Sequence, residues 1–183
     1  MLQYTTAKTD EDLKGILALQ KANVPAALSE EEMCSQGFVT IIHSYEALRK
    51  MNEIEPHVIA KQEGQVVAYL LAMTPASQNA VPVLKPMFDV FKRIMINNRP
   101  VSSFNFIVVG QVCVHKAFRG QGILDECYSF YKETFRSKYS FAITEIAIRN
   151  TRSISAHKRI GFEEIYQYTA PDGKEWSIVI CNW

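Results

Sequence analysis

The chain has 183 residues, of which 48% are hydrophobic and 21% are charged, and this length and composition are typical of one folded globular domain. Disordered, collagen-like and low-complexity chains are excluded. The 20 basic and 19 acidic residues leave a net charge of +1, so no overall field attracts the chain to nucleic acid or to an anionic membrane. We therefore predict a protein that binds neither.

The chain carries no sign of a second domain or of export. It contains no internal repeat and no linker rich in Gly and Ser, which predicts a single domain over residues 1–183. No stretch of about 18 apolar residues could span a bilayer, and Met1 to Lys8 lacks the apolar block of a signal peptide. The four cysteines show no C-x-x-C spacing and are expected to be reduced. These features favour a cytoplasmic protein.

The first half of the chain predicts three strands and four helices. Runs rich in β-branched and aromatic residues favour strands at Leu2 to Ala7, Val58 to Lys61 and Val66 to Met73. The last two runs flank a turn that contains glycine, as in an antiparallel hairpin. Helices are expected after the N-cap residues Thr9, Ser29 and Ser44. A further helix is expected before Asn97-Asn98 and Pro100, because helical spacing relates Met87, Phe88, Phe91, Ile94 and Met95.

In the second half, strands and helices alternate. The nearly continuous apolar run Phe104 to Val114 is typical of a strand that is covered on both faces. The further predicted strands are Phe141 to Ile148, Glu163 to Tyr168 and Trp176 to Cys181. The predicted helices are Leu124 to Phe135 and Thr151 to Ile160. This order indicates an α/β fold with a mixed sheet.

The loop that follows Val114 is the most informative segment. A loop that enters a helix directs several unpaired backbone N–H groups at one point, and such a point binds anions. Gly120 and Gly122 would let a phosphate approach the backbone closely, and Arg119 supplies a positive charge. The loop lacks the G-K-[ST] of nucleoside-triphosphate sites and the third glycine of a dinucleotide fingerprint. The alternative interpretation is an ordinary tight turn beside an exposed arginine.

Two blocks in the C-terminal half resemble the GNAT-type N-acetyltransferases. The segment V-C-V-H-K-A-F-R-G-Q-G-I-L, Val112 to Leu124, is similar to their acetyl-CoA loop, [QR]-x-x-G-x-[GA]. The segment N-T-R-S-I-S-A-H-K-R-I-G-F, Asn150 to Phe162, resembles their N-x-x-[AS]-x-x-x-Y-x-K-x-G-F. In this sequence His157 stands at the tyrosine position and Arg159 at the basic position, while Leu124 replaces the small residue that ends the first motif.

The resemblance implies a single-domain GNAT-like fold, with a mixed central sheet, flanking helices and two adjacent parallel strands that splay apart. The pantetheine arm of acetyl-CoA, the expected co-substrate, would lie between those strands like an added strand. Gly110 is expected to mark a bulge where the splay begins. The residues implied in coenzyme binding are Val112, Cys113, Val114, Arg119, Gly120, Gln121, Gly122, Ile123, Leu124, Asn150, Ser153 and Arg159.

Within that set, the N–H groups of Arg119 to Leu124 would hold the diphosphate, and Asn150 would bond to the pantetheine. Asp125 and Glu126 would repel a diphosphate, so we expect them to face away or to pair with Arg119. No cluster of metal ligands is evident in the sequence, and the implied chemistry needs no metal.

The implied reaction is direct transfer of an acetyl group from the thioester to an amine. It needs a base for the amine and a proton for the leaving thiolate. Glu145, on the strand that leads to Asn150, is the candidate base. His157 is the candidate acid and Tyr128 the alternative, although both also suit a packing role. The N–H groups around Val112 to Val114 could stabilise the developing oxyanion.

We therefore expect an acetyl-CoA-dependent N-acetyltransferase that acts on a primary amine of an unknown small molecule or protein. The alternative is a non-catalytic acyl-CoA sensor with the same fold, because His157 replaces the tyrosine of the family. The apolar C-terminal strand that ends at Trp183 could pair with its copy in another subunit, so a homodimer is a further hypothesis.

Overall fold

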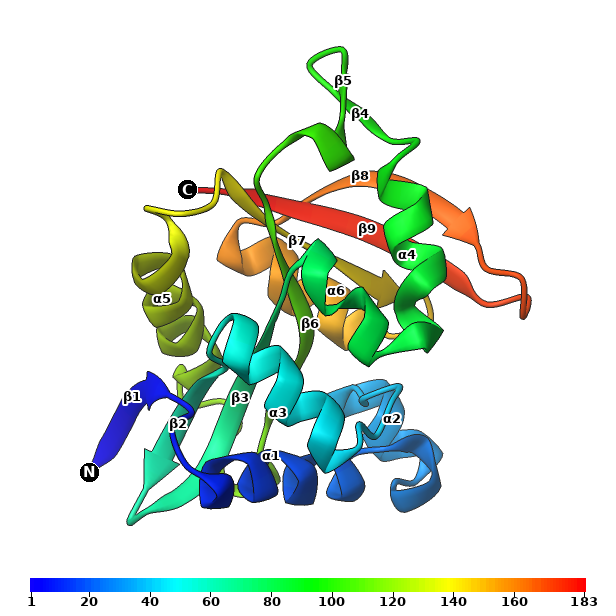
Figure 1. Ribbon diagram of the computed structural model, residues 1–183. Helices are drawn as coiled ribbons and strands as arrows, with labels where there is room; N and C mark the ends of the chain where they lie inside the picture. Colours follow the sequence, from blue (N-terminus) through cyan, green and yellow to red (C-terminus); the bar gives the residue numbers. More distant parts are fainter.

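The protein forms a seven-stranded mixed sheet with helices against both faces, in a computed structural model that describes residues 1–183 except Ala80 and Val83 (Figure 1). The helices are α1 (Asp10–Ala22), α2 (Glu30–Gln36), α3 (Tyr45–Ile54), α4 (Lys85–Phe91), α5 (Ile123–Phe135) and α6 (Thr151–Ile160). The strands are β1 (Leu2–Thr6), β2 (Val58–Gln62), β3 (Gln65–Met73), β4 (Met95–Ile96), β5 (Arg99–Pro100), β6 (Ile107–Val114), β7 (Phe141–Ala147), β8 (Glu163–Thr169) and β9 (Glu175–Asn182).

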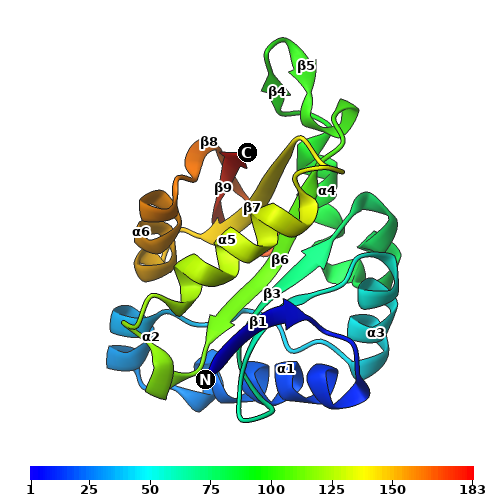
Figure 2. The same ribbon diagram turned by 90° about the vertical axis from the view of Figure 1, so that its left-hand side faces the viewer.

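The strand order of the sheet is β1-β2-β3-β6-β7-β9-β8. Neighbouring strands run antiparallel except β6 and β7, which pair in parallel. Helix α5 forms the crossover between these two strands and lies in front of β3 and β6 in Figure 2. The α/β fold with a mixed sheet that the sequence predicts is confirmed.

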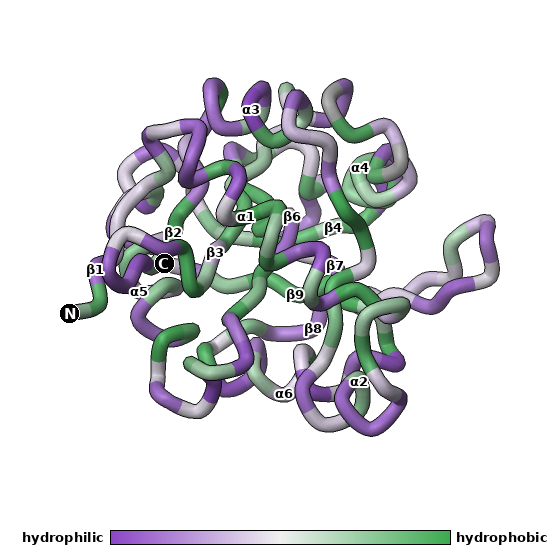
Figure 3. Tube along the Cα trace, turned by 90° about the horizontal axis from the view of Figure 1, so that it is seen from below, coloured by the Kyte–Doolittle hydropathy of each residue, from purple (hydrophilic) through white to green (hydrophobic). Residues whose placement is uncertain are grey.

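Each face of the sheet carries its own hydrophobic core. One core packs α1, α3 and α4 against the sheet, with Ile16, Met51 and Phe91 almost fully buried. The other packs α5 against the opposite face through Tyr131 and Phe135. In Figure 3 the middle of the sheet is largely hydrophobic, whereas the outer turns of α2 and α3 are hydrophilic. None of the helices among the described residues is long and apolar enough to cross a membrane.

The predicted helix starts are confirmed by their caps. The side chain of Thr9 accepts a hydrogen bond from the N–H of Asp12 and begins α1. The side chains of Ser29 and Ser44 begin α2 and α3 in the same way. Each cap satisfies one of the N–H groups that a helix leaves without a partner at its start.

The prediction of a helix that continues to Met95 is wrong. Helix α4 ends at Phe91, and Met95 lies in β4, which pairs with β5. Asn97 and Asn98 both adopt left-handed backbone angles, with φ of 50° and 61°. Two such residues in succession form the tight turn that suits a hairpin, and they direct the chain into a small ribbon that projects from the molecule (Figure 1).

The suggested dimer edge is also wrong. Strand β9, which ends close to Trp183, lies between β7 and β8 and pairs with both of them. Its backbone groups are therefore used inside the sheet, and the outer strands are β1 and β8. The C-terminal strand has no free edge to offer to a second subunit.

Candidate active site

The parallel strands β6 and β7 separate soon after they begin. Their backbones pair only at Ile107 with Ala142 and at Val108 with Ile143, although both strands continue well beyond these positions. At the next position the hydroxyl of Thr144 on β7 donates to the carbonyl of Val109 on β6 at 2.7 Å. This hydrogen bond lies where the gap between β6 and β7 begins. The predicted splay is confirmed.

A bulge in β6 accompanies the splay, as predicted at Gly110. Gly110 and Gln111 together face one residue of β3, Leu71, because Val109 pairs with Ala72 and Val112 with Leu70. A β-carbon on Gly110 would collide with the thioether of Met73. The glycine therefore permits close packing on β3 at the bend, in addition to the extra residue of the bulge.

Beyond the bulge, alternate residues of β6 direct their backbone groups to the gap. The N–H of His115 donates to Val67 on β3 at 2.8 Å. By the alternation of a strand, Cys113 then also faces β3, while Val112 and Val114 face away from it. The carbonyl of Val114 accepts from Arg119 Nε, and β7 has already diverged. The gap side of β6 thus offers the polar groups of an unpaired strand edge.

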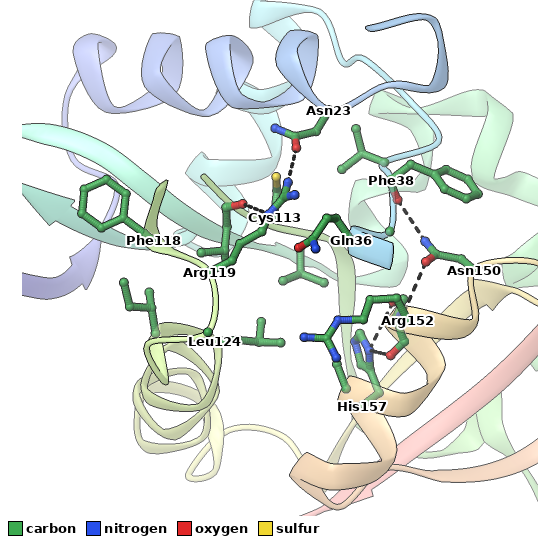
Figure 4. Close-up of a pocket in the computed structure, with 18 of the residues that line it drawn as sticks. Asn23, Gln36, Phe38, Cys113, Phe118, Arg119, Leu124, Asn150, Arg152 and His157 are labelled. Atoms are coloured by element: carbon green, nitrogen blue, oxygen red, sulfur yellow. Dashed lines mark hydrogen bonds between the residues drawn. The ribbon is translucent and has the colours of Figure 1, made fainter. Parts of the chain in front are cut away.

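A pocket of about 390 Å³ opens at this gap (Figure 4). Its walls come from the end of β6, the glycine loop, the first turns of α5 and α6, and the segment after α2. Of the residues that the sequence assigns to the coenzyme, this pocket is lined by Val112, Cys113, Val114, Arg119, Gly120, Gly122, Ile123, Leu124, Asn150, Ser153 and Arg159. Gln121 is not among the lining residues, and its side chain bonds to the carbonyl of Ala117 instead.

The glycine loop presents free amides to the pocket. Gly120 and Gly122 have φ of 74° and 77°, in the left-handed region that glycine tolerates best. Gly122 is the N-cap of α5 and provides no side chain to cap it. Among the described residues, no protein acceptor receives the N–H groups from Gly120 to Leu124. Together with the helix dipole, these donors form a site for an anion. The inclusion of the Arg119 N–H in the predicted set is wrong, because it donates to the carbonyl of Lys116 at 3.4 Å.

The two motif arginines are held by protein groups. Arg119 Nε donates to the carbonyl of Val114 at 3.0 Å, and its terminal nitrogen donates to Asn23 (Figure 4). Arg159 on α6 forms a two-point ion pair with Asp125 in the first turn of α5, with a second contact of 3.0 Å. This pair lowers the pKa of the Asp125 carboxyl. Both expectations for Asp125, that it faces away or pairs with Arg119, are therefore wrong, because Asp125 lines the pocket and its partner comes from the helix across it.

Arg152 is a pocket residue that the sequence analysis missed. Its guanidinium points into the pocket in Figure 4. Within the described part of the chain it has no hydrogen-bond acceptor and no acidic partner. The helical spacing could have indicated this position, because Arg152, Ala156 and Arg159 recur at i, i+4 and i+7 and therefore lie on one face of α6. The pocket therefore has one cation that is available to a ligand.

The side chain of Asn150 is already engaged. Its Oδ1 accepts from the N–H of Ser153 at 3.3 Å and caps α6, and its Nδ2 donates to the carbonyl of Phe38 at 3.0 Å (Figure 4). Asn150 thus joins the start of α6 to the segment after α2. The side chain forms part of the pocket wall, and one N–H of its amide remains without a protein acceptor.

His157 and Tyr128, the two candidate acids, contact each other. His157 Nδ1 lies 2.8 Å from the carbonyl of Ser153 and must donate there, so its Nε2 accepts from the hydroxyl of Tyr128 at 2.7 Å. Burial lowers the pKa of His157 to about 4 and raises that of Tyr128. The ring is neutral at pH 7 with both nitrogens engaged, which does not suit the predicted role of proton donor.

A second pocket, of about 660 Å³, reaches the gap from the side of α4. Gly110, Thr144 and Glu145 line it together with the β8–β9 turn. The carboxyl of Glu145 accepts a hydrogen bond from the hydroxyl of Tyr168, a residue that the sequence analysis did not single out. Burial raises the pKa of Glu145 to about 7, despite the opposing effect of this bond. A carboxyl with this pKa can accept a proton near neutral pH.

Known proteins support the assignment of the fold. The solved structures that are similar to this chain include the following three. The NatC complex bound to Gag peptide and CoA has 13% identity and a TM-score of 0.65, over 100% of this chain and 98% of that chain. The ribosomal-protein-S18-alanine N-acetyltransferase from Escherichia coli has 13% identity and a TM-score of 0.58, over 100% and 94%. Ard1 from Thermoplasma volcanium has 11% identity and a TM-score of 0.64, over 99% and 97%.

No curated protein matches the sequence. A family model described as the acetyltransferase (GNAT) family matches residues 24–162. The match includes the splayed strands, the glycine loop and both motif blocks. The chain therefore belongs to the GNAT family of acetyltransferases.

Proposed function

We propose that this protein transfers an acetyl group from acetyl-CoA to a primary amine. The observation that carries the proposal is a pair of pockets that border the gap between β6 and β7, one of which contains the unpartnered amides of Gly120 to Leu124. The first pocket suits the coenzyme and the second suits the acceptor. Family membership and the structural likeness to N-acetyltransferases support this assignment.

The residues of the first pocket fit acetyl-CoA, which supplies an activated acyl group when it is bound. The amides of Gly120 to Leu124 hold the diphosphate, and Arg152 adds the positive charge. The backbone groups of Val112 and the N–H of Val114 bond to the pantetheine as to an added strand, while the carbonyl of Val114 stays with Arg119. The N–H of Val112 is also the candidate donor to the developing oxyanion.

In the second pocket, Glu145 acts as the base. An ammonium must lose a proton before its nitrogen can attack the thioester carbon, and a carboxylate with a pKa of about 7 can take that proton. The new carbon–nitrogen bond forms as the carbon–sulfur bond breaks, and the second amine proton balances the charge of the leaving thiolate. In this proposal His157 forms part of the wall of the coenzyme pocket, and Tyr128 and Ser153 hold its ring in place through hydrogen bonds.

Calorimetric titration with CoA and dephospho-CoA tests the first pocket. We expect Arg152→Gln to weaken CoA binding about 10-fold, the loss of one hydrogen bond to a charged group. Lys158→Gln is the matched control, because Lys158 is exposed on the same helix outside the pocket. Equal affinities for the two variants would contradict the placement of CoA in this pocket.

A thiol-release assay against a panel of amines tests the transfer. Glu145→Gln should reduce turnover about 100-fold or more while CoA affinity stays unchanged. The second candidate function is the non-catalytic acyl-CoA sensor. It is favoured because both ring nitrogens of His157 are hydrogen-bonded, so the residue at the tyrosine position of the family is not available as an acid. It predicts CoA binding without thiol release for every amine.

A further inference from the structure

The wall of the acceptor pocket carries a cation that no role yet explains. Glu145, Ala147 and Arg149 all line the pocket and follow each other at a spacing of two residues. Within β7 this spacing directs Glu145 and Ala147 to the same face. Arg149 is the second residue after β7 and lies in the turn before α6. The pocket thus has a half-buried carboxyl near the gap and an exposed guanidinium further along the same wall.

Arg149 is free to bind a ligand. Its guanidinium lies over the ring of Phe38, 4.9 Å from the centroid. In the described part of the chain it has neither an acidic partner nor a hydrogen-bond acceptor. Stacking of this kind orients the guanidinium plane and leaves the N–H groups at its edge available. Phe38 lines the coenzyme pocket while Arg149 lines the acceptor pocket, so the stack lies at the boundary between the two.

The other charges of the pocket do not compensate Arg149. Lys174 and Asp172, both lining residues in the β8–β9 turn, neutralise each other through a contact of 2.6 Å. Glu175 is an exposed carboxylate that lines the same pocket, and it lies outside ion-pair distance of Arg149. The unpaired groups that face an acceptor are therefore Glu145, Glu175 and Arg149.

We propose that the acceptor is a zwitterion: a primary amine that faces Glu145 and, on the same molecule, a carboxylate that binds Arg149. This inference rests on the proposed acetyl transfer and adds the substrate class. Arg149 is four residues after Glu145, so even a fully extended chain would place their α-carbons no more than about 13 Å apart. Both residues line the same pocket, so a compact aminocarboxylate can reach both groups. A guanidinium and a carboxylate form a two-point hydrogen-bonded pair that an alkylamine cannot make.

The test is a thiol-release assay with acetyl-CoA and aminocarboxylates of increasing reach, namely glycine, 4-aminobutanoate and 6-aminohexanoate. Each is compared with its own carboxamide, which has the same length without the charge, and 1,6-diaminohexane tests the rival attraction to Glu175. We expect kcat/KM for at least one aminocarboxylate to exceed that of its carboxamide about 10- to 100-fold, as for one charge-assisted contact. Arg149→Gln should abolish the difference, and Arg149→Lys should restore part of it.

Lys174→Gln is the matched control, because it removes a cation of the same pocket that already has a partner. It should keep the preference. CoA affinity by calorimetry should be unchanged in all three variants, Arg149→Gln, Arg149→Lys and Lys174→Gln, which establishes that they are folded. Thiol release with carboxamides or the diamine at rates equal to or above the aminocarboxylates would overturn this inference alone. Release with no amine of any kind would overturn the proposed function as well.

Discussion

The loss of Asn150 should destabilise the protein even when no coenzyme is present. The side chain makes two bonds, one to the N–H of Ser153 at the start of α6 and one to the carbonyl of Phe38. Removal of an N-cap costs about 1 kcal/mol, and the second hydrogen bond contributes about 1 kcal/mol. In a domain of this size each kcal/mol lowers Tm by about 2–4 °C. Asn150→Ala should therefore melt about 4–8 °C below the unchanged protein.

Differential scanning calorimetry without ligand measures this shift. Asn150→Ser is the informative companion, because serine keeps an oxygen for the N–H of Ser153 but has no donor for Phe38. It should lose about half as much as the alanine variant. A melting temperature for Asn150→Ala within about 1 °C of the unchanged protein would refute the structural role. That result would instead support the role that the sequence motif implies for Asn150, which is a hydrogen bond to the pantetheine.

Three further predictions concern the coenzyme loop and the acceptor pocket. Asp125→Asn should tighten CoA binding about 2- to 5-fold in low salt, because it removes a negative charge beside the diphosphate. Arg159→Gln should weaken CoA binding. Calorimetry at two salt concentrations measures both affinities, and equal affinities would show that the ion pair has no effect on the ligand. Glu145 has a folded pKa of about 7 against 4.5 ordinarily, so the folded state holds this proton more tightly, and the free energy of unfolding should fall as pH rises from 4.5 to 7. Urea unfolding across that range should show the fall in the unchanged protein and a smaller one in Glu145→Gln. Gly122→Ala should lower the free energy of unfolding by about 1–2 kcal/mol through its left-handed backbone alone, since a β-carbon there would meet nothing within 4 Å; no loss in urea unfolding would contradict this reasoning.

The features that the sequence predicts well are those set by local chemistry. Thr9 and Ser29 begin their helices because a hydroxyl can bond to an N–H three residues ahead, with no help from the rest of the fold. Gly110 marks the bulge because a glycine inside a β-rich run needs a backbone reason. The β4–β5 hairpin at Asn97-Asn98 could not be predicted in this way, because the apolar spacing up to Met95 is equally compatible with a helix.

The polar contacts of the site could not be predicted, because they join distant parts of the chain. Arg159 and Asp125 come from the two helices that flank the pocket, and each is locally an ordinary surface residue. Tyr168 bonds to Glu145 only because β9 places β8 beside that wall of the sheet. A motif fixes the backbone around a site, while the tertiary fold decides which side chains remain free to meet a ligand.

Arg119 and Arg152 show how this distinction can be measured. The motif draws attention to Arg119, but its guanidinium is held by Val114 and Asn23, so its loss should disturb the loop itself. Arg119→Gln should therefore reduce both the stability of the free protein and its CoA affinity, since two bonds of about 1 kcal/mol or more each are lost before any ligand binds. Arg152→Gln should reduce affinity alone, because the side chain has no partner in the described part of the chain. Thermal melting and CoA titration of the two variants separate these effects. If Arg152→Gln melted early and Arg119→Gln did not, the assignment of one arginine to the loop and the other to the ligand would have to be reversed.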